Sequence, residues 1–349
     1  MRWLPAGLVL SLAIAVVGPA VLLADDDPEN RSDIIIHGAV DESAIRPLLE
    51  AFGHHRPRIA VRYREFNSLA LYRHFLEQPD DRPDLMLSPA MHLQLKLVND
   101  GYALRYRSAQ TDRLSKRAKW RDELFGYALD PIVIAINTDL LAGDPLPQSR
   151  DQLLELIRRK DHLLDEKIGL SDIESTGLGY LAWSYDSQLS RTYERLLEAF
   201  GIHHSRLYPN TASMLRALTK GEIFIAYNAL GSYTRAWSQR HPWIVPVLPM
   251  DYTTVVVRTA FIPKSTRNPA AAQAFLDFLL SEAGQQALAE RSSLIPIGTG
   301  LDGEDTILQS AHSLLKPIPL GLELLLQTDA AKRQLLFDEW RSAMPHLAK

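Results

Sequence analysis

The 349-residue sequence contains no cysteine. Thiol catalysis, thiolate metal sites and disulfide bonds are therefore all excluded. A chain of this length can bury cores large enough to fold without covalent cross-links, and the length favours two domains. The absence of cysteine thus excludes several classes of site, and a chain of this length does not need disulfides to fold.

A strong excess of charge of either sign is also lacking. The chain has 38 Lys and Arg residues against 42 Asp and Glu residues, which gives a formal net charge of −4. No basic patch or acidic tail interrupts this balance, so the sequence predicts no nucleic-acid partner. The net charge does not exclude an anionic ligand, because helix dipoles and a few arginines can dominate one cleft.

The motifs of several large enzyme classes are missing. There is no G-x-S-x-G nucleophile elbow, no H-E-x-x-H zinc motif and no Walker A loop. No other set of a nucleophile with its base is evident. We therefore predict that the protein is not an enzyme, has no catalytic residue, and uses no cofactor or resident metal.

One long uncharged hydrophobic run is present, at Leu4–Leu23, between Arg2 and the acidic stretch that follows Ala24. This order predicts a secretory signal peptide over residues 1–24, and hence a periplasmic protein. A retained membrane anchor is the alternative, since about 20 apolar residues can span a bilayer. Cleavage is favoured because helix-breaking residues interrupt the run, at Pro5, Gly18 and Pro19.

The remaining sequence alternates between strand and helix patterns. Buried-strand segments at 33–39, 59–66 and 83–89 are each followed by apolar residues at helical spacing. This order is typical of a parallel α/β sheet. Two long extended segments, 125–137 and 245–263, are interpreted as strands that cross from one lobe to another and back.

The predicted fold class is therefore α/β, with two lobes of mixed, mainly parallel sheets that are joined by two crossing strands. We expect one lobe to comprise residues 33–130 plus 256–345, and the other to comprise residues 131–255. The protein is expected to be a monomer.

Polar side chains and glycines stand where the predicted strands end. In open α/β sheets, ligands bind beyond the carboxyl ends of the strands, beside helix N-termini whose unpaired N–H groups favour anions. Two further candidates lie on the crossing segments. The predicted ligand-binding residues are His37, Gly38, Ser88, Asp130, Ser175, Thr176, Tyr227, Asn228 and Tyr252.

Some of these residues have a purely structural alternative. Ser171 and Glu174 fit a capping box, so Ser175 and Thr176 serve either a ligand or the start of a helix. Alternation along the strand EIFIAYN leaves open whether Tyr227 points into the cleft.

The two candidates on the crossing segments are also open to two interpretations. Asp130 either lines the cleft or caps the crossing, and Tyr252 either borders the cleft or packs as a half-buried hinge residue.

Five segments of the chain together form a familiar pattern. They are IIIHGAVDESAIRPLLEAF, PDLMLSPAMHLQLKLVNDGYA, FGYALDPIVIAIN, GEIFIAYNALGSYTRAW and DYTTVVVRTAFIPKSTRNPAAAQAFLDFLLSEAGQQAL. The last is the most specific: a return strand, a Pro-Lys turn and an Asn-Pro-initiated helix with a Ser-Glu-x-Gly-Gln end. In these segments the chain resembles the extracellular solute-binding proteins of ABC importers. Within this superfamily the chain is similar to the type 2 branch that includes ferric-ion binding proteins and phosphoglycerate- or sugar-phosphate-type binding proteins.

The resemblance implies two lobes that close over a small-molecule ligand by hinge motion. It also implies delivery of the ligand to an ABC permease in the inner membrane, or to the periplasmic domain of a membrane sensor kinase.

The spacing of tyrosines bears on the identity of the ligand. Ferric-ion binders of this branch hold iron with tyrosines that cluster after the strand equivalent to EIFIAYN. Here Tyr227 and Tyr233 are six residues apart, and the adjacent pair is missing. We therefore predict capture of a small anionic metabolite, an organophosphate or a carboxylate, for an ABC importer. A ferric-iron binding protein and a ligand-sensing adaptor for a two-component sensor kinase are the alternatives.

Overall fold

The computed structural model describes residues 32–141, 143–291, 294–297 and 314–348, which belong to one compact unit. The predicted signal peptide, residues 1–24, lies outside the described residues. Within the described ranges, no helix combines the length and the apolar character needed to cross a bilayer.

Twelve strands form one continuous hydrogen-bonded path with side branches. They are β1 (Ser32–Gly38), β2 (Ile59–Glu65), β3 (Leu85–Ser88), β4 (Lys119–Trp120), β5 (Leu124–Asn137), β6 (Ile168–Ser171), β7 (Arg206–Tyr208), β8 (Ile225–Leu230), β9 (Ile244–Val247), β10 (Thr253–Phe261), β11 (Ile295–Pro296) and β12 (Leu315–Pro317).

The α-helices follow the strands in the alternating order that the sequence predicts. They are α1 (Glu42–His55), α2 (Ser68–Glu77), α3 (Met91–Asn99), α4 (Ala109–Arg113), α5 (Arg150–Arg159), α6 (Asp161–Leu164), α7 (Gly177–Leu189), α8 (Tyr193–Ile202), α9 (Thr211–Thr219), α10 (Gly231–Ser238), α11 (Pro269–Leu280), α12 (Glu282–Arg291) and α15 (Ala330–Ala343). Short 3-10 helices are η2 (Pro79–Asp81), η3 (Leu322–Thr328) and η4 (Pro345–Ala348).

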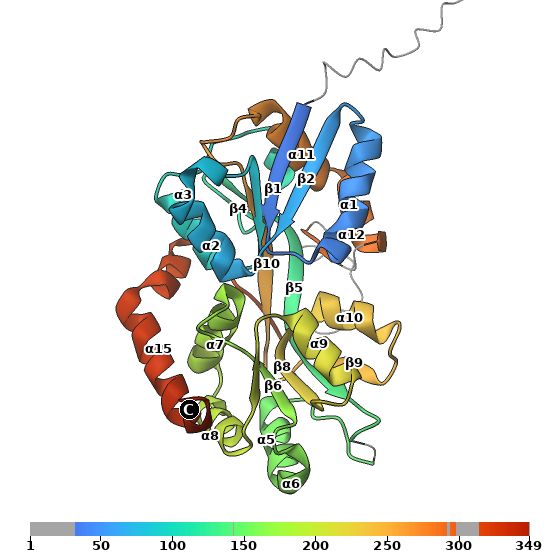
Figure 1. Ribbon diagram of the computed structural model, residues 1–349, viewed down its shortest axis with the longest axis vertical. Helices are drawn as coiled ribbons and strands as arrows, with labels where there is room; N and C mark the ends of the chain where they lie inside the picture. The colour runs from blue at the N-terminus through green and yellow to red at the C-terminus, as the bar shows by residue number, and fades with distance from the viewer. Residues whose placement is uncertain (1–31, 142, 292–293, 298–313, 349) are drawn as a thin grey trace, which may run out of the picture. The chain divides into compact units, whose positions relative to one another are not determined.

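The strand order divides the path into two sheets that share β5. The first sheet has the order β2-β1-β3-β10-β5, and the second has the order β5-β8-β6-β7. Strands β1, β2 and β3 are parallel to one another, as are β6, β7 and β8. Strands β5 and β10 pair antiparallel to each other and lie side by side between the two sheets (Figure 1). The predicted mixed α/β fold with crossing strands is confirmed.

The return segment differs from the single extended run that we predict over 245–263. It forms two strands: β9 pairs with the second half of β5, whereas β10 pairs with the first half. The chain leaves the sheet between them, at a segment that contains Pro249 and Asp251. Here the Met250 N–H donates to the Gln148 carbonyl at 2.7 Å and the Asp251 carboxylate accepts from Arg150, so this stretch bonds to the residues at the start of α5 instead of to β5.

Aromatic side chains fix helices of the first sheet onto one another. Phe52 of α1 packs edge-on against Phe275 and Phe278 of α11, with ring centroids 4.8 and 5.5 Å apart. Full burial of one such side chain is worth about 1.5–3 kcal/mol. This packing fixes the C-terminal half of α1 against α11.

The C-terminal helix α15 packs on helices of the second sheet. Trp340 contacts Trp183 of α7, with ring centroids 4.6 Å apart (Figure 1 shows α15 beside α7 and α8). The predicted lobe boundaries assign Trp340 to one lobe and Trp183 to the other. Helix α15 therefore packs against the lobe to which it was not assigned. The boundaries themselves remain a prediction.

Candidate functional site

A small cavity lies where the carboxyl ends of strands from both sheets meet. Its volume is about 80 Å³, and we call it the inner cavity. On the first-sheet side it is lined by Ala39, Asp41, Glu65, Phe66, Asn67, Ser68 and Pro89. On the second-sheet side it is lined by Ser171, Thr176, Leu178, Gly179, Pro209, Asn210, Thr211, Leu230 and Tyr233.

The N-termini of several helices point at the inner cavity. Each of three cap residues accepts a hydrogen bond from its own first turn: Asn67 from α2, Thr176 from α7 and Asn210 from α9. An N-terminus carries a partial positive charge from aligned peptide dipoles. Helices of both sheets therefore direct this positive end toward one volume, which favours an anionic group on a ligand.

Asp41, the N-cap residue of α1, does not cap its own helix. Within the described part of the chain, its half-buried carboxylate makes no hydrogen bond. Burial, and then the neighbouring Glu65 carboxylate, raise the pKa of Asp41 above its ordinary value. The Glu65 side chain instead accepts from the Glu42 N–H at 2.7 Å, at the start of α1. One carboxylate thus remains available at the cavity wall.

Three hydrogen bonds join the two sides of the inner cavity. Asn67 Nδ2 donates to the Pro209 carbonyl at 2.9 Å, and the Leu178 N–H donates to Ser68 Oγ at 3.2 Å. The Asp41 N–H donates to the Tyr233 hydroxyl oxygen at 3.0 Å. The two sides are therefore in direct contact around the cavity.

Gly177, the first residue of α7, permits part of this contact. A Cβ atom at this position would lie 2.6 Å from Leu93 Cδ1 and 3.2 Å from Ala90 Cβ, both on the first-sheet side. A larger residue would require the Leu93 side chain to move and would press against Ala90. Glycine at position 177 thus allows helix α7 to approach α3 closely.

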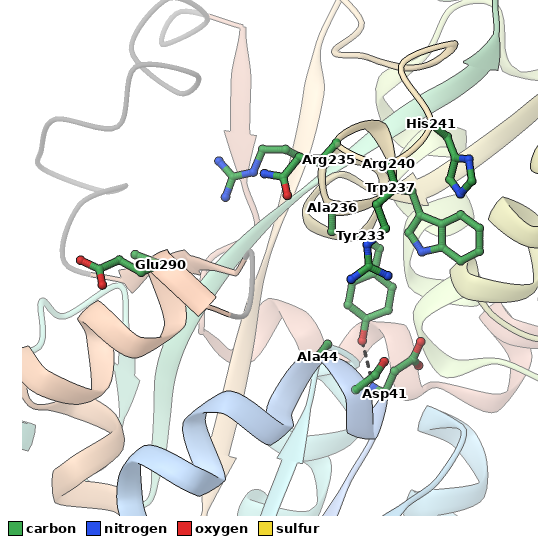
Figure 2. A pocket seen from close by; sticks show the side chains of 12 residues that line it. Asp41, Ala44, Tyr233, Arg235, Ala236, Trp237, Arg240, His241 and Glu290 are labelled. Carbon is green, nitrogen blue, oxygen red and sulfur yellow. Dashed lines mark hydrogen bonds between the residues drawn. The ribbon is translucent and has the colours of Figure 1, made fainter.

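A larger cavity adjoins the inner one and shares Asp41 and Tyr233 with it (Figure 2). This outer cavity has a volume of about 580 Å³. Figure 2 shows the Tyr233 hydroxyl directed at Asp41, with Arg235 and Glu290 extending from opposite walls. The further lining residues are Ser43, Ala44, Ala236, Trp237, Gln239, Arg240, His241 and Ala289.

Size favours the outer cavity as a ligand site, whereas position favours the inner one. The outer cavity runs along the sides of α1, α10 and α12, so most of its lining residues lie away from strand ends. The inner cavity lies at the carboxyl ends of parallel strands, which is where ligands bind in open α/β sheets. We therefore take the inner cavity as the candidate site.

Three of the predicted site residues converge, but on a buried carboxylate. Asp186 of α7 accepts from the Tyr227 hydroxyl at 2.9 Å, Asn228 Nδ2 at 2.9 Å and the Tyr252 hydroxyl at 2.6 Å. Arg150 donates to the same carboxylate at 3.1 Å and is also bonded to Asp251. We call this group the Asp186 network. None of its members lines either cavity.

The backbone explains why Tyr227 and Asn228 reach the same partner. Asn228 has a φ of 59°, in the left-handed region, and the pairing of β5 with β8 shifts register near this point. Simple alternation along β8 therefore ends at Asn228. Burial raises the pKa of Tyr227 well above its ordinary value, which keeps the hydroxyl protonated and able to donate.

Asp130 lies at the crossing in a fully buried ion pair. Its carboxylate accepts from Arg258 of β10 at 2.7 Å, and from both the N–H and the hydroxyl of Ser232 at 2.9 and 2.6 Å. These bonds tie β5, β10 and the start of α10 together. The structure thus places Asp130 in the contact between the crossing strands.

The predicted residues of the first sheet lie just behind the cavity wall. His37 is buried against Phe66 and His74, and burial lowers its pKa to about 4. The side chain of Tyr63 occupies the space beside Gly38, and Ser88 Oγ accepts from the Ala90 N–H at 3.1 Å. Their immediate neighbours Ala39 and Pro89 are the residues that face the cavity.

The segment around Ser175 splits between the two interpretations. Ser175 is exposed and does not line the inner cavity, whereas Thr176 lines it and also caps α7 through a 2.9 Å bond from the Gly179 N–H. Of the predicted site residues, Thr176 is the one that lies on the wall of the inner cavity.

Sequence reasoning missed Asp41, Glu65, Asn67 and Tyr233. A usable signal was present for two of them, because Asp41 and Asn67 are polar residues that directly precede a helical pattern. The residues just before these two helices reach the cavity, as do the last residues of three strands, Glu65, Ser171 and Leu230. Tyr233 carried no such signal, since it lies inside α10.

The fold resembles those of solved solute-binding proteins. A substrate-binding protein of an ABC transporter from Agrobacterium tumefaciens is 28% identical, with a TM-score of 0.85 over 93% of this chain and 97% of that one. AfuA from Actinobacillus pleuropneumoniae, with fructose-6-phosphate bound, is 17% identical, with a TM-score of 0.73 over 90% and 99%. Iron-bound HitA from Pseudomonas aeruginosa is 18% identical, with a TM-score of 0.66 over 89% and 99%.

No curated protein matches the sequence significantly. The sequence of residues 37–291, however, matches a family model described as bacterial extracellular solute-binding protein. This is a family of binding proteins, which confirms the prediction that the chain is not an enzyme. The matched residues include β2, β3, the parallel group β6 to β8 and both crossing strands, so the chain belongs to the bacterial extracellular solute-binding protein family.

Proposed function

We propose that this protein captures a small anionic solute, an organophosphate or a carboxylate, in the inner cavity and delivers it to an ABC importer. One observation carries the proposal: capped helix N-termini from both sheets point at one cavity. Such termini present N–H donors and a positive dipole end to an anion. The small volume favours a compact solute over the drug-sized ligands that occupy about 300–1,000 Å³.

The bonds across the cavity suggest how capture proceeds. Ser68 Oγ and the Tyr233 hydroxyl accept from main-chain N–H groups in the contact between the two sides. Oxygen atoms of a bound solute would compete for such donors. We infer that the two sides separate by a hinge motion at β5 and β10 to admit the solute, and then close over it.

The partnership with an ABC transporter and the periplasmic location are inferred from similar proteins. The relative from Agrobacterium tumefaciens is a substrate-binding protein of an ABC transporter, and AfuA is a periplasmic binding protein. The A-V-L-L-A sequence before Asp25 supports export to the same compartment.

A thermal-shift panel tests the proposal directly. The purified protein is screened with orthophosphate, sugar phosphates, di- and tricarboxylates, neutral sugars and Fe(III). A bound solute raises the melting temperature by mass action, so phosphates or carboxylates are expected to stabilise the protein. Stabilisation by Fe(III) alone, with a coloured tyrosinate absorption band, would overturn the proposal.

Two matched variants locate the site. Ala39→Leu places a larger side chain in the inner cavity and fills it. Ala236→Leu places the same additional side-chain volume in the outer cavity. Ala39→Leu is expected to abolish the thermal shift, whereas Ala236→Leu retains it. The reverse pattern would place the solute in the outer cavity.

A further inference from the structure

The charges on the inner cavity wall are unevenly distributed. Asp41 and Glu65 lie on the first-sheet side, whereas the side-chain groups on the second-sheet side are uncharged. None of the described residues on the wall is Lys, Arg or His. A cavity whose helix N-termini favour an anion thus also carries two carboxylates.

We propose that the solute is a zwitterion, an aminoalkyl phosphate, phosphonate or carboxylate, whose ammonium group meets Asp41 and Glu65. Its anionic group then meets the N-termini of α7 and α9 on the opposite wall. This inference rests on the proposed function, since it assigns a substrate class to the same cavity.

The geometry around Asp41 carries most of this inference. An N-cap aspartate ordinarily accepts from the N–H groups of its own first turn. Asp41 makes no such bond, and its main-chain N–H is held by Tyr233. Its carboxylate is therefore fixed at the cavity wall with its oxygen atoms available to a donor. An ammonium group offers three donors and a positive charge for this purpose.

Other charges near Asp41 are placed less favourably for a ligand. Arg258 and Arg216 lower the pKa of Asp41, but burial and Glu65 outweigh them. Arg258 is committed to Asp130 on the crossing strands, and neither arginine lines the inner cavity. A solute with anionic groups alone would place negative charge beside Asp41 without a cation on the wall to offset it.

A matched series of solutes tests the substrate class by calorimetry on the purified protein. Phosphoethanolamine carries both charges, ethyl phosphate lacks the ammonium group, and ethanolamine lacks the phosphate. β-Alanine and propionate form the corresponding carboxylate pair. We expect the zwitterion of at least one pair to bind about tenfold or more tightly than its simple anion, because charge-assisted hydrogen bonds are strong.

Variants then connect this preference to the wall. Asp41→Asn removes the charge but keeps the shape of the side chain and the hydrogen bonds that the structure describes for this residue. The ratio of the anion dissociation constant to the zwitterion dissociation constant should therefore fall about tenfold. Glu65→Gln should lower the ratio in the same direction while its oxygen still accepts from Glu42. Glu42→Gln is the control: it removes a negative charge from the residue next to Asp41, which does not line the inner cavity. It should leave the ratio unchanged.

The outcomes separate the two proposals. Equal or tighter binding of the simple anions, or a ratio that Asp41→Asn leaves unchanged, overturns the zwitterion while the anion site stands. If neither pair binds and no other phosphate or carboxylate stabilises the protein, the proposed function itself fails.

Discussion

Asp186, inside helix α7, and Asp41, just before helix α1, are both aspartates that lie near the ends of parallel strands in space or in sequence, yet their surroundings differ completely. Asp186 accepts hydrogen bonds from Arg150, Tyr227, Asn228 and Tyr252 and is closed off from solvent. The Asp41 carboxylate has no hydrogen bond within the described ranges and borders two cavities. A polar residue near a strand end is thus available to a ligand only when the fold leaves it without an internal partner.

The largest expected effect comes from opening the Asp186 network. Arg150→Met leaves a buried carboxylate without its cation, which typically costs about 3–5 kcal/mol of unfolding free energy. Urea denaturation followed by tryptophan fluorescence measures the loss. The double variant with Asp186→Asn removes both charges and should recover part of it. A loss below about 1 kcal/mol would show that this carboxylate is less dependent on its partners than the structure indicates.

His92 offers a buried polar side chain whose ring packs near Tyr180 but has no hydrogen-bond partner among the described residues. Neither ring nitrogen has a hydrogen bond in the described structure, and burial lowers its pKa to about 3. The pKa is lowered from 6.5, so the stabilising contribution is present above pH 6.5 and lost as pH falls toward 3. Two pH units below 6.5, the loss is expected to be about 2–3 kcal/mol.

The measurement is the free energy of unfolding of wild type and His92→Phe between pH 7.5 and about pH 4.5. The variant should lose stability less steeply on acidification. Buried His37, whose pKa is lowered to about 4, should keep part of the slope in both proteins. Identical slopes would show that His92 accepts its proton without penalty.

Gly177→Val tests the contact between the two sides of the inner cavity. Its side chain would clash with Leu93 and Ala90, so closure over a solute should be hindered. Affinity is expected to fall about tenfold, or about 1.4 kcal/mol, with a smaller change in unfolding free energy. Gly53→Val is the matched control, because a Cβ at Gly53 meets nothing within 4 Å. Unchanged affinity for Gly177→Val would argue against closure at this contact.

The smallest expected change in stability is that of Asp41→Asn. Because the pKa of Asp41 is raised in the folded protein, its charged form opposes folding above the ordinary aspartate pKa. Removal of the charge should leave stability unchanged or raise it by about 0.5 kcal/mol at pH 7, and the difference should vanish in acid. Thermal unfolding at both pH values checks this. A clear loss of stability would mean that Asp41 has an internal role.

Much of the fold could be predicted from the sequence because the strand and helix periods are strong. The crossing strand β5 is found within one residue of the predicted segment 125–137, and the alternating order of elements is confirmed. The return segment was predicted less well, since apolar residues continue across the break between β9 and β10. Periodicity reports burial, and β10 is buried throughout whereas both ends of β9 are buried.

The candidate site was less predictable than the fold. Tyr227 and Asn228 were predicted at the end of their strand, but they lie inside β8, which continues to Leu230. A left-handed residue at Asn228 turns both toward Asp186, about 40 positions away in the sequence. Asp130 meets an arginine on another strand. No local pattern contains these partners, and the partners decide whether a polar group remains available.

The sequence by itself determined the order of strands and helices and the crossing strands, because each depends on neighbouring residues and on periods of two or 3.6. The helix caps were predicted less well: Thr176 caps α7 in place of the proposed Ser171 and Glu174 box. It also determined the family, through segments that span the described fold. Only the tertiary structure decided which polar groups are satisfied internally and which border a cavity. That choice depends on contacts between residues far apart in the chain, such as Asp41 with Tyr233 and Arg150 with Asp186.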